Sequence, residues 1–196
     1  MGMIITPYNL VQGPADLYAA PFGSAEPADS AATVAAGAPG GAFVGVGATD
    51  ADVTMEIDVT VDDLMVDQVI DPVGGRVTAR QISLKTQLRE VTLSNMSLAV
   101  NGMVTTTVSA SYSVQEPTIA SDATQPVYTA LIFDTWAPTL ASGAPARRRI
   151  IVRKVLSKPK VQLVSGKGKN ALYDCTWTAY WISPTVKLYH QVDQTA

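Results

Sequence analysis

The side chains that most often carry out protein chemistry are scarce in this sequence of 196 residues. It contains one histidine, His190, and one cysteine, Cys175. A Ser–His–Asp triad would need His190 as its base, yet this residue is the seventh counted from the carboxyl terminus, in a region that is often frayed. Cys175 alternates in phase with Tyr173 and Trp177, which is typical of a buried thiol. Because no nucleophile, base and oxyanion donor come together, we expect no enzymatic activity.

Three further patterns fall short of a catalytic or binding motif. Glu56 and Asp58 would share one strand face, as a pair of glycosidase carboxylates does, but neighbouring acids on a wet face are more often solvated. Residues 166–169 read Gly-Lys-Gly-Lys, without the earlier glycine and the Ser or Thr of a phosphate loop. One cysteine and one histidine exclude Cys-based zinc clusters and His-rich sites, and EF-hand spacing is absent. We therefore predict no metal ion and no cofactor.

Composition predicts a globular chain. The length fits one domain over residues 1–196, and 47% apolar residues argue against global disorder. A net charge of −3 does not favour a general nucleic-acid binder. The uncharged stretches 30–49 and 91–115 are too rich in glycine, proline or hydroxyl residues to cross a bilayer, so we expect no membrane insertion.

Alternating apolar and polar residues predict the first two strands. The alternation from Val53 to Asp62 is typical of a half-buried strand with one acidic face, and residues 64–70 continue it. Turn chemistry at residues 71–75, Asp-Pro-Val-Gly-Gly, is expected to end it. Residues 82–89 alternate again, which predicts a second strand antiparallel to the first.

The rest of the chain predicts more strands and one short helix. Thr92 can cap the helix, and Asn101-Gly102 can end it. The expected strands are 104–114 with a hydroxyl-rich face, 127–136 buried, 150–155, 160–164, and 172–182, with a hairpin loop at 165–170. The last strand would bury Trp177 and Trp181 together. The predicted fold is mostly β: a sandwich or barrel of antiparallel strands with one short flanking α-helix.

Residues 19–48 have an unusual composition, since 20 of these 30 residues are alanine, glycine or proline. No helical or strand period is visible in them, so a long loop is expected. Two interpretations remain: a flexible insertion, or an arm that docks on another subunit.

Charge is segregated along the chain. Eight acidic residues and no basic ones lie between Asp50 and Asp71, and nine basic residues and no acidic ones lie between Arg147 and Lys169. Two interpretations are open: the two segments form ordinary solvated faces, or they form surfaces of opposite charge that align copies of the chain with one another. The run Arg147, Arg148 and Arg149 could meet phosphate, form salt bridges between subunits, or stay in water.

An ordered set of segments carries a resemblance to a known family. The set comprises Leu17-Tyr18-Ala19-Ala20-Pro21-Phe22-Gly23 with Glu26-Pro27, the acidic strand from Val53, Val66-Asp67-Gln68 followed by Asp71-Pro72-Val73-Gly74, the helix region from Thr92 to Gly102, the arginine run before Ile150, and a late strand toward Tyr189. Together they resemble the tail tube proteins (major tail proteins) of long-tailed bacteriophages.

The resemblance implies an architecture and a set of partners. Six copies would close into a ring, and stacked rings would form a hollow tube whose lumen holds DNA and the tape measure protein. Tail terminator and distal tail proteins would be further partners, and the protein would be made in the bacterial cytoplasm and end in the virion tail. The arm 19–48 and the hairpin 62–76 are expected at inter-ring contacts.

Particular charged residues follow from this expectation. Like charge keeps a polyanion from adhering, so Glu56, Asp58 and Asp62 are expected to face the lumen. The residues expected at contacts between subunits are Asp63, Asp67, Asp71, Arg76, Arg147, Arg148 and Arg149.

Other functions stay open. A carbohydrate- or receptor-binding β-sandwich would stack exposed Trp136, Trp177 or Trp181 on sugars, although the apolar phase of Trp177 and Trp181 favours burial. A tail terminator or a related secretion-tube subunit would share the same fold, and a hydrolase would lack a base.

Overall fold

Antiparallel β-structure dominates the computed structural model, which describes residues 10–29, 39–109, 111–117, 126–140, 143–158, 167 and 171–194. The strands are β1 (Asp16–Pro21), β2 (Val44–Gly45), β3 (Thr54–Val66), β4 (Val69–Leu88), β5 (Met103–Ser109), β6 (Tyr112–Pro117), β7 (Thr129–Ala137), β8 (Ala146–Ser157), β9 (Tyr173–Ala179) and β10 (Tyr189–Asp193). The helix is α1 (Leu93–Ala99). The predicted mostly-β class with one short helix is confirmed.

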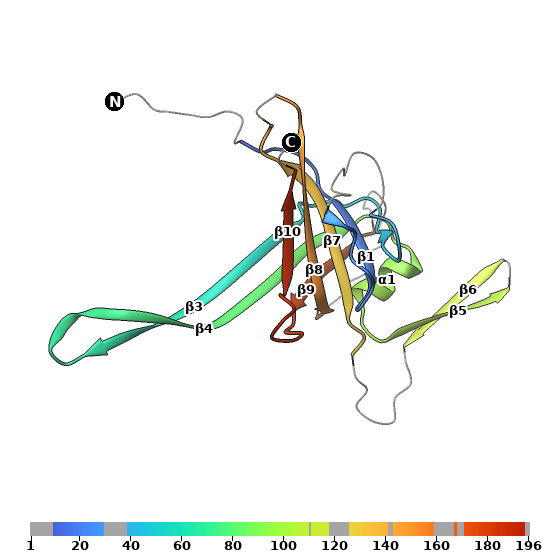
Figure 1. Cartoon of the computed structure of the whole chain (residues 1–196). Helices are drawn as coiled ribbons and strands as arrows, with labels where there is room; N and C mark the ends of the chain where they lie inside the picture. The colour runs from blue at the N-terminus through green and yellow to red at the C-terminus, as the bar shows by residue number, and fades with distance from the viewer. Residues whose placement is uncertain are drawn as a thin grey trace.

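Eight strands form one sheet, and the remaining two, β5 and β6, pair only with each other. The order across the large sheet is β2-β1-β7-β8-β9-β4-β3, and β10 also pairs with β8. One side of β8 is shared by two strands: Arg148–Val152 pairs with β10, and Val155–Ser157 pairs with β9. Beyond β9, the long strands β3 and β4 leave the body of the sheet together (Figure 1).

The core lies on both faces of this sheet. On one face, Leu131, Val152 and Trp177 are among the buried residues against which the α1 residues Met96 and Leu98 pack. The opposite face holds a smaller cluster that includes Phe43 and Ile132. Burial of these side chains is the main favourable contribution to folding.

Helix α1 begins as the sequence predicts. The Thr92 side chain accepts a hydrogen bond from the Asn95 backbone N–H, which satisfies one of the free donors at the helix start. The buried amide of Asn95 donates to the carbonyl oxygens of Val46 and Glu90, at 2.8 and 2.7 Å. After the helix, Gly102 has φ +83°, a left-handed conformation that glycine adopts without steric cost.

The β3–β4 hairpin corrects two expectations. Its turn lies at Asp67–Gln68, and residues 71–75 are part of β4. Pro72 is tolerated there because, among the described strands, only β3 pairs with that part of β4, so a missing N–H breaks no second ladder. The predicted half-burial of β3 is also wrong: Ile57 and the apolar residues after it are exposed, since the hairpin projects from the body (Figure 1).

The predicted single strand 104–114 is a second hairpin. Strand β5 ends at Ser109, and Ser109 pairs with Tyr112 of β6. The Ser109 hydroxyl accepts a hydrogen bond from the Ser111 N–H, a local turn contact that the uninterrupted alternation of residue types concealed. The Gln115 side-chain amide donates to Leu93 O and Ser97 Oγ, which fastens this hairpin to α1.

Residues 19–48 are not a loop throughout. Ala19–Pro21 belongs to β1, which pairs with β7, and Val44–Gly45 forms β2. Pairing with the buried strand β7 outweighs the weak local strand preference of alanine. Residues 30–38 of the proposed arm lie outside the described residues, as do the expected strand 160–164 and most of the loop 165–170.

The two most apolar predicted strands are confirmed. Strand β7 is buried over most of its length, and Tyr173, Cys175 and Trp177 of β9 point into the core. Trp181, however, is 69% exposed, because β9 ends at Ala179 and the alternation that placed Trp181 inside does not continue.

Candidate assembly surfaces

One face of the β3–β4 hairpin is acidic. Glu56, Asp58 and Asp62 alternate along β3, so their side chains point to the same side of the strand. All three are exposed. Lys85 of β4 lies 2.9 Å from Glu56, and its hydrogen bond and positive charge lower the pKa of that carboxyl. Asp62 lies opposite Arg76, one of the predicted contact residues.

The other face of the same hairpin is apolar. It presents Ile57, Val59 and Val61 of β3 next to Val77 of β4, and all four are exposed. Arg80, the cross-strand partner of Val59, adds a positive charge to this face near the base of the hairpin. At the base of the hairpin this face continues into the core through Leu84. Beyond the base, no other described element pairs with or packs on the two strands, so an amphipathic ribbon stands in solvent with its apolar side uncovered.

The outer edge of β3 is also open. This strand is 13 residues long and terminates the large sheet, so within the described chain only β4 pairs with it. A long exposed strand edge is a template for pairing with another chain, and proteins usually shorten or cover it.

The hairpin tip, residues 62–71, combines charge with exposed apolar side chains. Asp63, Asp67 and Asp71, all predicted contact residues, are exposed there. Leu64 is exposed too, and Ile70 is 95% exposed, the highest value among the large apolar residues.

The three consecutive arginines occupy three different environments. The Arg147 guanidinium lies 3.9 Å from the centre of the Trp136 ring. Arg148 donates two hydrogen bonds of 2.7 Å to Asp193, which raise the pKa of Arg148 and lower that of Asp193. Arg149 is buried and paired with Asp134. Arg149 therefore has almost no surface to offer another subunit, contrary to the expected contact, and Arg148 is already engaged within the chain.

A groove lies where β4 and β10 diverge. It measures about 870 Å³, and we call it the β10 groove; its lining includes Arg80, Trp181, Lys187, Tyr189 and His190. His190 lies in a paired strand, opposite Ile151, so it is not in a frayed end.

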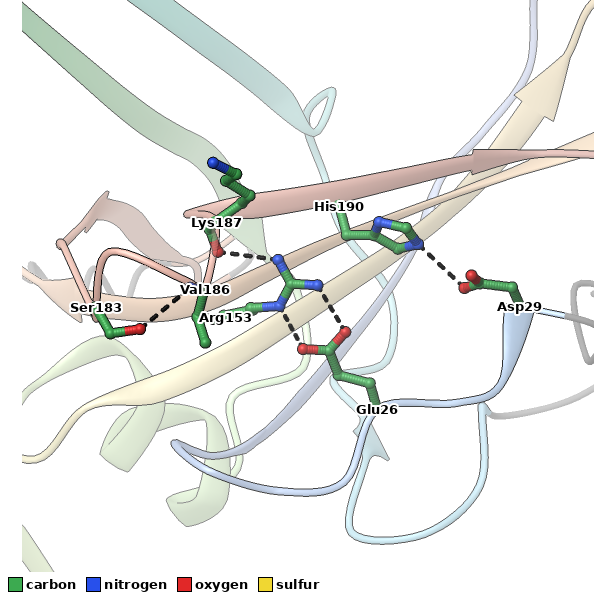
Figure 2. A network of polar contacts seen from close by, with 7 residues as sticks. All are labelled: Glu26, Asp29, Arg153, Ser183, Val186, Lys187 and His190. Carbon is green, nitrogen blue, oxygen red and sulfur yellow. Dashed lines mark hydrogen bonds and ion pairs between the residues drawn. The ribbon is translucent and has the colours of Figure 1, made fainter.

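One ion pair and one histidine–carboxylate contact fasten residues 26–29 beside this groove (Figure 2). The Arg153 guanidinium donates to both carboxylate oxygens of Glu26 and, at 2.9 Å, to the carbonyl oxygen of Lys187. His190 Nε2 lies 3.0 Å from an oxygen of Asp29. These contacts join the segment after β1 to β8 and β10. Alternation of residue types does not predict them.

The residues first considered for chemistry are dispersed. Burial, together with the neighbouring Asp174 charge, raises the pKa of Cys175 to about 12, so its thiol stays protonated at neutral pH. No three His, Cys, Asp or Glu side chains of the described segments are arranged to hold a metal ion. Likewise, none of the described helical structure is long and apolar enough to cross a membrane.

Two comparisons with known proteins found no match. The sequence matches no protein-family model, and no curated protein matches it.

Proposed function

We propose that this chain is a tail tube protein: a structural virion protein that assembles into stacked hexameric rings, forming the hollow tail through which a phage genome is ejected. The observation that carries the proposal is the β3–β4 hairpin, which leaves an apolar face and a 13-residue strand edge uncovered. The ordered resemblance in the sequence supports the same function.

Self-association is the simplest way to cover this surface. An isolated two-stranded hairpin is marginally stable in water, and exposed apolar faces on strands favour association. Ile57, Val59 and Val61 would pack against a neighbouring copy, whose sheet could also pair with the open edge of β3. Repetition of this contact around an axis closes a ring.

The acidic face then has a role in the tube. When the apolar face of the hairpin is covered by neighbours, Glu56, Asp58 and Asp62 remain on the free side. Six copies would surround the lumen with negative charge, along which DNA and the tape measure protein pass without specific binding. Tail terminator and distal tail proteins would contact the two ends of the tube.

Electron microscopy of the concentrated protein tests the proposal. Negatively stained wild-type protein should show hollow cylinders with a central channel. Val61→Asp should prevent their formation, because it places a charge on the apolar face opposite Val77, whereas Thr60→Asp adds the same charge on the acidic face and should leave cylinders intact. A protein that stays monomeric at every concentration in analytical ultracentrifugation would contradict the proposal, as would isolated rings, which would favour a tail terminator.

A carbohydrate- or receptor-binding module is a second candidate, favoured by one observation. Trp181 is exposed beside the β10 groove, and an exposed indole can stack on a sugar ring. Clear hits on a glycan array that disappear in Trp181→Ala would support this alternative.

A further inference from the structure

The β10 groove exists because two strands diverge. Strand β9 pairs with β4 only at Ser83–Leu88, so the rest of β4 departs from the sheet while β10 stays on β8. Arg80 of β4 lines one side of the groove, and Lys187 and Tyr189 line the other. On its outer side, β10 pairs with no other strand of the described chain, so this strand edge is open.

The charged groups of the groove are predominantly basic. Arg80 and Lys187 make no side-chain ion pair with any described residue, and both are exposed. The one acid of the lining, Asp193, is held by Arg148. The carboxylate of Asp29, which lies beside the groove, contacts His190 Nε2. An occupant of the groove should therefore be acidic.

The groove also carries an aromatic anchor. Trp181 is 69% exposed although it is the largest side chain of the lining. Tryptophan, tyrosine and arginine dominate the binding energy of protein interfaces, and Trp181, Tyr189 and Arg80 bring one of each to this surface. An occupant should therefore also offer an apolar side chain.

The hairpin tip carries both acidic groups and an exposed apolar side chain. It presents the carboxylates of Asp63, Asp67 and Asp71, and Ile70 is almost fully exposed beside them. The hairpin projects away from the body of its own chain (Figure 1), so its tip is presented outward to a neighbouring molecule.

We propose that the β10 groove of one copy receives the hairpin tip of a second copy. This inference rests on the proposed self-assembly and names the receiving surface. Asp67 and Asp71 would face Arg80 and Lys187, and Ile70 would pack against Trp181. Because the two surfaces differ, the contact is head-to-tail and repeats from copy to copy, as a ring or a stack requires.

Charge reversal and charge exchange test the contact. Asp67→Lys with Asp71→Lys, and separately Arg80→Glu with Lys187→Glu, should each raise the protein concentration needed for assembly at least about tenfold, corresponding to about 1.4 kcal/mol. Combining all four substitutions in one chain should restore assembly, because the charges are exchanged. Asp52→Lys with Glu116→Lys makes the same charge change as the Asp67 and Asp71 pair, away from both surfaces, and should have little effect. Circular dichroism and urea unfolding verify that each variant folds.

The aromatic anchor gives a second test. Trp181→Ala should weaken assembly, whereas Tyr112→Ala, which removes another exposed aromatic side chain on β6, should not. The proposal fails if wild-type protein assembles and neither reversal alters the assembly concentration, while the proposed function then stands. If wild-type protein does not assemble, the proposed function itself fails.

A competing occupant is distinguished in the same variants. A fluorescein-labelled single-stranded oligonucleotide would detect nucleic-acid binding by anisotropy. Binding that is lost in Arg80→Glu with Lys187→Glu, with assembly unchanged, would assign the groove to nucleic acid and overturn the inference.

Discussion

Arg149 and Asp134 face each other across β8 and β7 as a buried, doubly hydrogen-bonded ion pair. Arg149 Nε and Nη2 donate to Asp134 Oδ1 and Oδ2, each at 2.8 Å, and the two side chains are 5% and 2% exposed. They are direct cross-strand partners in the register of the sheet. The pair favours that register, because a slip of one residue between β7 and β8 would place the two charges on opposite faces of the sheet.

Removing one partner of this pair should strongly lower the stability of the folded protein. Asp134→Ala should lower the free energy of unfolding by about 3–5 kcal/mol, because it leaves the guanidinium buried and unpaired. Asp193→Ala breaks the partly exposed pair with Arg148 and should cost about 1 kcal/mol or less. Urea unfolding monitored by tryptophan fluorescence measures both, and equal losses would contradict the assigned difference in burial.

The Arg148–Asp193 pair should make stability depend on pH at the acidic end. The hydrogen bonds from Arg148 hold the pKa of Asp193 below its ordinary value of 3.8. The unfolded chain therefore binds this proton more readily, so the stabilisation is complete above that value and is lost as the pH falls through the lowered pKa.

Asp193→Asn should accordingly destabilise the protein near neutral pH and converge with wild type only as the pH falls below the lowered pKa of Asp193. Urea unfolding at several pH values measures the convergence. NMR titration of Arg148→Met should show the pKa of Asp193 returning toward 3.8, and an unchanged pKa would exclude Arg148 as its cause.

Cys175 should be chemically inert in the folded protein. Because burial raises its pKa to about 12, Ellman's reagent at pH 8 should not react with native protein but should react with one thiol per chain in denaturant. Ser113→Cys places a thiol on the exposed strand β6 and should react in the native state. Rapid native reaction of wild type would show that β9 opens readily.

The Asn95 amide should stabilise the junction of α1 with the sheet. Asn95→Ala leaves the carbonyl oxygens of Val46 and Glu90 without this donor and should cost about 1–3 kcal/mol in urea unfolding. Ser94→Ala changes an exposed neighbour in the same helix and should stay within about 0.5 kcal/mol of wild type. A cost for Asn95→Ala as small as this control would contradict the role of the amide.

Under the proposed tail tube function, the acidic face should affect genome passage more than assembly. Replacing Glu56, Asp58 and Asp62 by lysine should then leave tubes intact and slow DNA ejection, because a basic lumen attracts the polyanion. Ejection is measured by fluorescence of a DNA dye after receptor addition, with Glu116→Lys as a control. Ejection at the wild-type rate would remove the lumen assignment.

Local patterns predicted much of the sheet, but not what covers it. Alternation identified the strands of the β3–β4 hairpin and β9, a continuous apolar run identified β7, and capping chemistry identified α1, because these signals lie within a few residues. Strand β1 was missed because its alanines become a strand only by pairing with β7. The exposure of Ile57 could not be predicted, since alternation defines a face and not its neighbour. The partners of Arg149 and Arg153 depend on strand register and on contacts distant in sequence.

Within the described chain, strand β10 pairs with a single neighbouring strand, β8. It shares β8 with β9 but forms no pair with β9, so its detachment breaks the five pairings from Tyr189 to Asp193 and the side-chain contacts of this strand, and leaves the pairing of β9 intact. Such local opening requires less free energy than unfolding of the whole domain. Amide hydrogens of β10 should consequently exchange with solvent sooner than those of β9, which is held between β8 and β4.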